Sequence, residues 1–74
     1  AEVAADFTSI TLRALRDEVP NVRFVAAQLL AEAVAAGVYD RSRIAADIRP
    51  SLAALASDPD PDVKYFVGVA LAAC

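Results

Sequence analysis

The sequence contains no histidine, methionine or tryptophan, and it has a single cysteine among its 74 residues. Without histidine the commonest general acid or base of enzymes is missing. The chain also lacks a glycine-rich phosphate loop, and no Ser or Cys nucleophile has a plausible base beside it. We therefore expect no enzyme activity, no catalytic residues and no cofactor. The lone Cys74 cannot form an internal disulfide, which favours a reducing compartment, the cytoplasm or also the nucleus.

Basic residues are outnumbered, with seven Lys and Arg against ten Asp and Glu and a net charge of −3. A negative field repels the phosphates of nucleic acids and anionic lipids, so neither is an expected partner. The longest apolar runs, 33–39 and 67–74, are far shorter than the roughly 20 residues that span a bilayer. Acidic residues at positions 2 and 6, with no basic segment before them, also argue against a signal peptide.

An internal repeat organises the chain. The hydrophobic content of 58% is dominated by Ala, Val and Leu, with two glycines, and this composition favours helix over strand. A shift of 41 residues then aligns the chain with itself, which is the period of helical-pair repeats. The shift places Asp17 on Asp58, Pro20 on Pro61, Val22 on Val63, Arg23 on Lys64, Phe24 on Tyr65 and Leu30 on Leu71. We infer two copies of one helical unit.

Apolar spacing and helix-end residues place the first two helices. The apolar residues Phe7, Ile10, Ala14 and Leu15 share one helical face. The first helix is predicted over about 3–16. The second begins with Pro20, whose missing N–H is harmless in the first turn, and ends near Ala36. Gly37 follows as the natural residue for a left-handed conformation.

The third helix, predicted over about 43–57 with Asp40 or Ser42 as its cap, contains Pro50 and should bend there. Asp60 is the expected N-cap of the fourth helix, with Pro61 as its first residue. Residues 1–37 and 38–74 thus form two antiparallel helical hairpins in one solenoid segment. Whether the first and last helices are truncated stays open. Both ends of the stack are apolar, so we expect further repeats or another copy of the chain there.

Three residues of the second copy, Pro50, Asp58 and Lys64, resemble the HEAT-repeat signature in their spacing of eight and six. The first copy keeps Asp17 and Arg23 but has serine at the position of the proline. The resemblance implies an all-α, α-α superhelix of the HEAT/armadillo-like type. It also implies that the turn aspartates and the basic residues form a ladder of hydrogen bonds between neighbouring repeats.

More specifically, residues 21–24 and 62–66 resemble the last repeats of the scaffold (A) regulatory subunits of protein phosphatase 2A. The likeness covers most of the chain after Phe7, and it departs at 39–43 and 67–74. It implies a non-catalytic scaffold or adaptor that holds a protein partner, the phosphatase catalytic subunit, through its intra-repeat turns. The partner-binding residues carried over are Asp17, Glu18, Val19, Pro20, Asn21, Arg23, Asp58, Pro59, Asp60, Asp62, Lys64 and Tyr65.

Two other interpretations compete with the scaffold. The alternating aspartates of 58–62 begin like a calcium-binding loop, but Val63 stands where the loop needs glycine and Val69 where it needs a bidentate glutamate. We therefore expect no metal. The second alternative is a self-associating or designed HEAT-like module, in which the apolar ends of the stack form a homo-oligomer.

Overall fold

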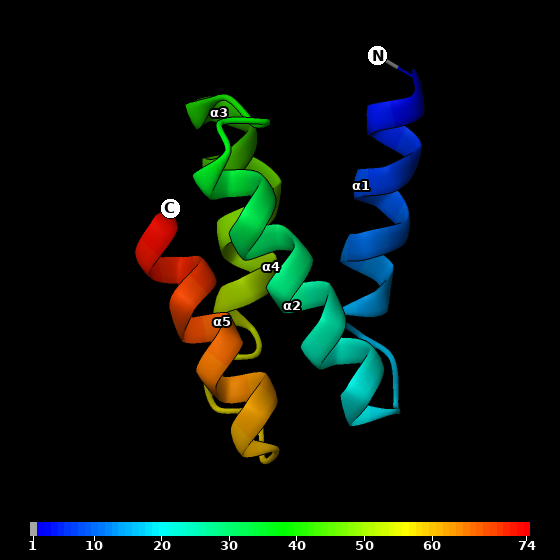
Figure 1. Cartoon of the computed structure of the whole chain (residues 1–74), viewed down its shortest axis with the longest axis vertical. Coiled ribbons are helices and arrows are strands. Elements are labelled where there is room, and N and C mark those ends of the chain that lie inside the picture. The colour runs from blue at the N-terminus through cyan, green and yellow to red at the C-terminus, as the bar shows by residue number, and fades with distance from the viewer. Residues whose placement is uncertain (1) are drawn as a thin grey trace.

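A computed structural model describes residues 2–74, and it describes side chains from Thr8 onward. The described chain consists of helices joined by turns, without strands, which confirms the expected all-α class (Figure 1). Phe7, one of the apolar residues assigned to the first helix, lies outside the described side chains. The helical elements in chain order are α1 (Glu2–Ala14), α2 (Pro20–Ala35), α3 (Arg41–Arg43), the π-helical turn η1 (Ile44–Ile48), α4 (Arg49–Ala53) and α5 (Pro61–Ala73).

The first hairpin, α1 and α2, follows the expected helix ends closely. Pro20 is the first residue of α2, and Gly37 adopts the left-handed conformation with φ of 77°. The N–H of Val38 donates to the carbonyl of Ala33, and that of Gly37 to the carbonyl of Val34. These two bonds satisfy carbonyls that the end of a helix leaves without partners. The end of α1 differs from the predicted end: it lies at Ala14 and not at residue 16.

The third helix consists of α3, η1 and α4 in direct succession, and its predicted bounds of 43–57 are wrong at both ends. It begins earlier because the Asp40 side chain accepts the N–H of Arg43 at 2.8 Å, which settles the choice of cap. It ends at Ala53, after which Leu55, Ala56 and Asp58 donate to carbonyls three residues back. These tighter turns reverse the direction of the chain before Pro59.

The expected distortion at Pro50 takes the form of a π-helical turn just before it. The N–H of Arg49 donates to the carbonyl of Ile44, five residues back. A proline at position 50 can give no N–H to Ala46, and its ring crowds that carbonyl. The wider turn of η1 relieves this conflict, so the helix continues through Pro50 as α4.

The two hairpins stack chiefly through their second helices, α2 and α5, which lie side by side in Figure 1. The rings of Phe24 and Phe66 meet across this contact with centroids 5.0 Å apart. No helix of residues 2–74 is long and apolar enough to cross a membrane. The buried apolar core consists of Leu15, Ala26, Ala27, Leu30, Ala31, Val34, Ile48, Leu52, Val63, Val67 and Ala70.

Candidate functional site: the turn ridge

The two intra-repeat turns lie at the same end of the stack, the lower end in Figure 1. The twelve predicted partner-binding residues sit on these turns and on the first turns of α2 and α5. We call them the turn ridge. Helix stacking alone accounts for this placement, because α2 and α5 run alongside each other and each begins just after its turn.

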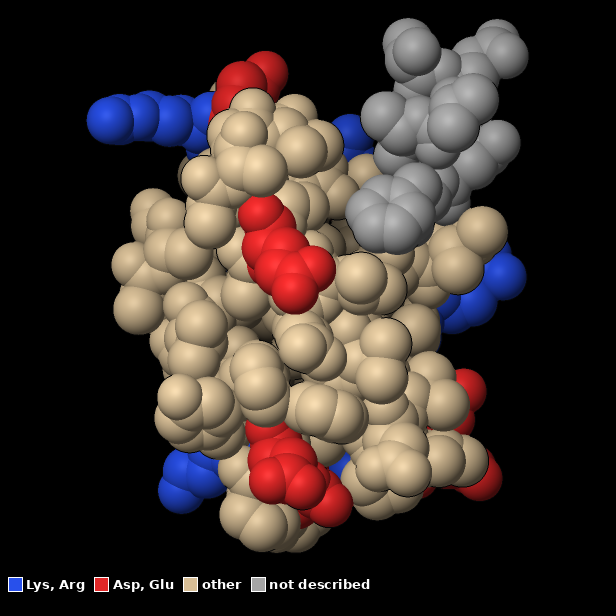
Figure 2. All heavy atoms as spheres, viewed as in Figure 1, with Lys and Arg blue, Asp and Glu red and all other residues tan. Residues whose placement is uncertain are grey.

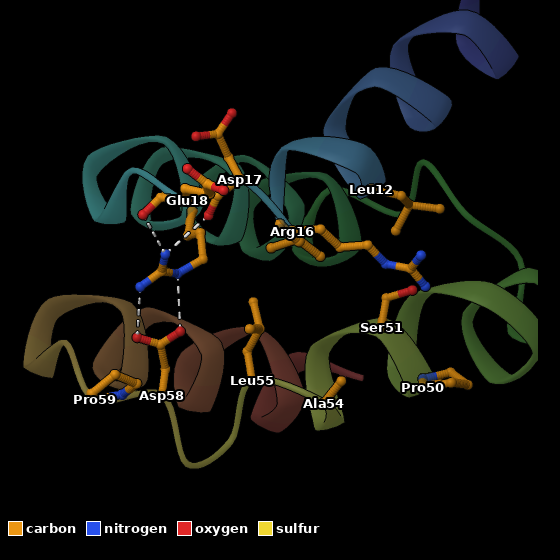
Figure 3. Close-up of a pocket in the computed structure, with 12 residues that line it drawn as sticks. Leu12, Arg16, Asp17, Glu18, Pro50, Ser51, Ala54, Leu55, Asp58 and Pro59 are labelled. Atoms are coloured by element: carbon orange, nitrogen blue, oxygen red, sulfur yellow. Dashed lines mark hydrogen bonds and ion pairs between the residues drawn. The ribbon is translucent and has the colours of Figure 1, made fainter.

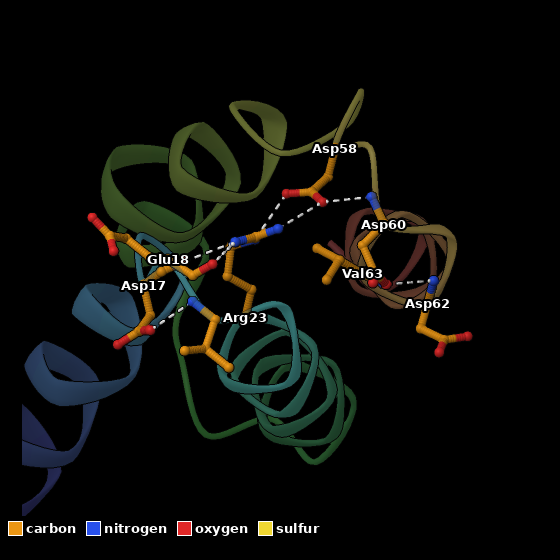
Figure 4. Close-up of polar contacts among 8 residues, drawn as sticks. Asp17, Glu18, Arg23, Asp58, Asp60, Asp62 and Val63 are labelled. Atoms are coloured by element: carbon orange, nitrogen blue, oxygen red, sulfur yellow. Dashed lines mark hydrogen bonds and ion pairs between the residues drawn. The ribbon is translucent and has the colours of Figure 1, made fainter.

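Arg23 of α2 ties the two turns together (Figure 4). Its Nε donates to one carboxylate oxygen of Asp58 at 2.9 Å, and its second terminal nitrogen donates to the other oxygen at 3.1 Å. Its remaining nitrogen donates to the backbone carbonyls of Asp17 at 2.9 Å and Glu18 at 3.0 Å. The guanidinium therefore fixes its own turn and reaches the next repeat, as the ladder implied by the resemblance requires.

The two aspartates at the start of the turns have the same local role. The Asp17 carboxylate accepts the N–H of Val19 at 2.9 Å, and the Asp58 carboxylate accepts the N–H of Asp60 at 2.9 Å. Asp58 differs because it also receives Arg23, with only 5% of its side chain and 14% of the Arg23 side chain exposed. A bidentate pair of this kind fixes orientation as well as adding energy.

The second turn ends in the expected N-cap. The Asp60 carboxylate accepts the N–H groups of Asp62 at 2.9 Å and Val63 at 3.1 Å, ahead of Pro61 in the first turn of α5. The aspartates at 58 and 60 are thus occupied with the backbone of the turn. Among residues 2–74 no group of three or more His, Cys, Asp or Glu is placed to hold a metal ion.

The environment of Asp58 makes folding sensitive to acid. Burial raises the pKa of Asp58, but the hydrogen bond from Asp60 N–H and the adjacent Arg23 guanidinium lower it by more, so the pKa lies below its ordinary value. The unfolded chain then binds a proton at a higher pH than the folded chain does. Stability from this group is therefore full above the unfolded pKa of about 3.9, and it is lost as pH falls through the folded value.

We expect the free energy of unfolding to decline as pH is lowered from about 5, with a smaller decline in Asp58→Asn. Urea titrations followed by circular dichroism at several pH values measure this directly. The pKa of Asp40 is also lowered, by the Arg43 N–H and the Ser42 hydroxyl, so part of the decline remains in the variant. An equal decline of the free energy of unfolding with falling pH in the parent chain and in the variant would show that Asp58 is not the group responsible for the acid sensitivity.

The remaining ridge side chains face solvent. Glu18, Val19, Pro20, Asn21, Pro59, Asp62 and Lys64 are all exposed. Tyr65 is 65% exposed, although its ring also packs edge-on against Phe66 with centroids 5.0 Å apart. Five carboxylates on the ridge stand against Arg23 and Lys64, and Figure 2 shows acidic side chains at this lower end. The ridge is an acidic edge with apolar side chains between the charges.

A second exposed surface lies on the side of the first hairpin away from the second, at one of the two stack ends that the sequence predicts to be apolar. Ile10, Val22, Val25 and Leu29 line an apolar hollow there. Within the repeat, Val22 and Leu29 correspond to Val63 and Ala70, which are fully buried in the stack. The aligned copies identify the residues of this surface, because the face that is buried in the second copy is also apolar in the first.

The chain is 42% identical over 62 residues to the A-type regulatory subunit of protein phosphatase PP2A from Saccharomyces cerevisiae. That match takes in 78% of this chain. The chain is a HEAT-type segment resembling that yeast protein. The segment spans about a tenth of the yeast protein's length, since the match covers 10% of it. No family model matches the HEAT-type segment, and no solved structure matches it.

Proposed function

We propose that this HEAT-type segment is a non-catalytic scaffold whose turn ridge binds a partner protein, and that the partner is a phosphatase catalytic subunit. The observation that carries the proposal is the Arg23 bridge, which joins both turns into one surface. A surface held rigid before binding loses less entropy on association. The exposed ridge side chains are not needed for the core, so they are free to contact a partner. The single cysteine fits a cytoplasmic or nuclear location.

The apolar face of Ile10, Val22, Val25 and Leu29 supports a second part of this proposal. It is the surface onto which a preceding helical hairpin stacks, in the way that α2 of the first hairpin covers α5. The corresponding residues Val63 and Ala70 are buried by that packing. A second copy of the chain is the competing occupant, and a light-scattering mass above that of one chain, at the concentrations used for binding, would reveal it.

Charge reversal on the ridge tests partner binding. We expect the double variant Glu18→Lys with Asp62→Lys to bind the purified phosphatase 2A catalytic subunit more weakly, by about tenfold or more, because both side chains are exposed on the acidic edge. Surface plasmon resonance gives the affinity, and circular dichroism checks that folding is unchanged.

Glu32→Lys is the matched control, since Glu32 is an exposed carboxylate of α2 outside the ridge. The control should bind like the parent chain. Equal affinity for the parent and the double variant would remove the ridge from the proposed function.

A further inference from the structure

A hollow of about 540 Å³ lies beside the turn ridge, between α1 and α4 (Figure 3). Its volume falls within the roughly 300 to 1,000 Å³ of ligand pockets. Leucines from both hairpins line it, Leu12 and Leu15 from the first and Leu55 from the second. On the α4 side the lining residues Ser51 and Ala54 are small, so the two hairpins do not fill the space between them.

Two polar side chains that line the hollow, Ser51 and Asp58, already have hydrogen-bond partners. The Ser51 hydroxyl donates to the carbonyl of Asp47 at 2.7 Å. Both carboxylate oxygens of Asp58 accept from Arg23, and one of them also accepts the Asp60 N–H. Away from Arg16, a group that enters the hollow therefore meets leucine and alanine side chains and polar atoms that already have partners. Such a lining suits an apolar side chain.

The rim of the hollow carries an uncompensated negative charge. Glu18 lines the hollow beside the turn, and no cation of the described residues lies within ion-pair distance of its carboxylate. Arg23 forms its ion pair with Asp58, and its remaining nitrogen donates to backbone carbonyls and not to the Glu18 carboxylate. Arg16 lines the same hollow, but in Figure 3 its side chain extends away from Glu18 toward Ser51.

We propose that this hollow takes one apolar side chain from an extended segment of the partner protein, with an adjacent basic residue of that segment paired to Glu18. The proposal rests on the proposed function, since it names the chemistry by which the ridge partner is held. Apolar burial supplies the affinity, and the Glu18 charge sets the direction of the segment. The basic residue lies on the Glu18 side of the hollow, because the Arg16 side chain, near Ser51, repels it from the other side.

Filling the hollow tests the proposal. We expect Ala54→Leu to weaken binding of the phosphatase 2A catalytic subunit by roughly tenfold, since the new side chain takes the place of the partner's. Ala54 is exposed and has ordinary helical backbone angles, so leucine should not disturb the fold. Ala53→Leu is the matched control, because Ala53 is the exposed neighbour on α4 and does not line the hollow. The control should bind like the parent chain.

A second measurement does not depend on that phosphatase. The probe is a blocked tetrapeptide, glycine-leucine-arginine-glycine, added at millimolar concentration to the isotope-labelled chain and followed by amide chemical shifts. We expect shifts at Ala54, Leu55 and Glu18, binding about tenfold weaker in Ala54→Leu, and weaker binding of the peptide with glutamate in place of arginine. Shifts confined to other surfaces, or equal binding by Ala54→Leu, would overturn the proposal.

The outcomes separate the two proposals. If the charge reversal at 18 and 62 weakens binding of the catalytic subunit while Ala54→Leu does not, the ridge stands and the hollow does not take the partner. If the parent chain fails to bind the catalytic subunit, the proposed function falls, and the peptide titration still decides whether the hollow takes an apolar side chain beside a basic one.

Discussion

Asp58→Ala should lower the free energy of unfolding by about 2 to 3 kcal/mol, because it removes two charge-assisted bonds from Arg23 and the cap on the Asp60 N–H. The larger part comes from Arg23, whose side chain is 14% exposed and would keep its charge without a carboxylate beside it. A chain of this size has a total stability of only roughly 4 to 11 kcal/mol, so the loss is a large fraction. Urea unfolding followed by circular dichroism measures it, since the chain has no tryptophan to report by fluorescence.

Asp17→Ala is the internal control for this substitution. Asp17 occupies the same position in the first repeat and accepts the equivalent turn N–H, that of Val19, but no guanidinium reaches its carboxylate. We expect a loss of about 0.5 to 1 kcal/mol, as for other lost capping bonds. The difference between the two variants isolates the bridge between repeats. Similar losses for both would show that Arg23 and Asp58 contribute little to the stack.

Leu30→Ala should be as damaging, lowering the free energy of unfolding by about 3 kcal/mol. Leu30 belongs to α2 and is fully buried in the core that joins the two hairpins. Truncation leaves a cavity in this core that the surrounding helices can fill only in part. The same urea titration reports the loss.

Leu29→Ala, one residue earlier on α2, gives the comparison, because Leu29 is 38% exposed on the outer apolar face. We expect it to lose less than about 1.5 kcal/mol, in line with the smaller area that it removes from water. Equal effects of the two substitutions would mean that the outer face is covered in solution, as it would be in a dimer of the chain.

The fold could be predicted from the sequence because its determinants are local and repeated. Pro20, Gly37, Asp60 and Pro61 fix helix ends through their own backbone chemistry, and all four lie where expected. The bounds of the third helix were wrong because its ends depend on competition between Asp40 and Ser42 and on how the chain accommodates Pro50. Periodicity alone cannot weigh a π-helical turn against a bend.

The ridge was predicted in outline and the hollow was not. Turn residues can be recognised by their Asp and Pro, and a repeat of 41 residues places both turns at one edge. The hollow depends on which faces of α1 and α4 oppose each other and on the small side chains of Ser51 and Ala54 between them. Neither is visible in the spacing of apolar residues, which marks only the face that is buried.

Hydrogen–deuterium exchange of the chain, alone and bound to the phosphatase 2A catalytic subunit, tests the turn ridge most directly. The account predicts slower exchange on binding over 17–23 and 58–65, with no change over 31–36, because only the two turns contact the partner. Slower exchange confined to 22–29 and 10–14, the outer apolar face, would contradict it. So would a bound state in which only one of the two turns is protected, since Arg23 holds both as one surface.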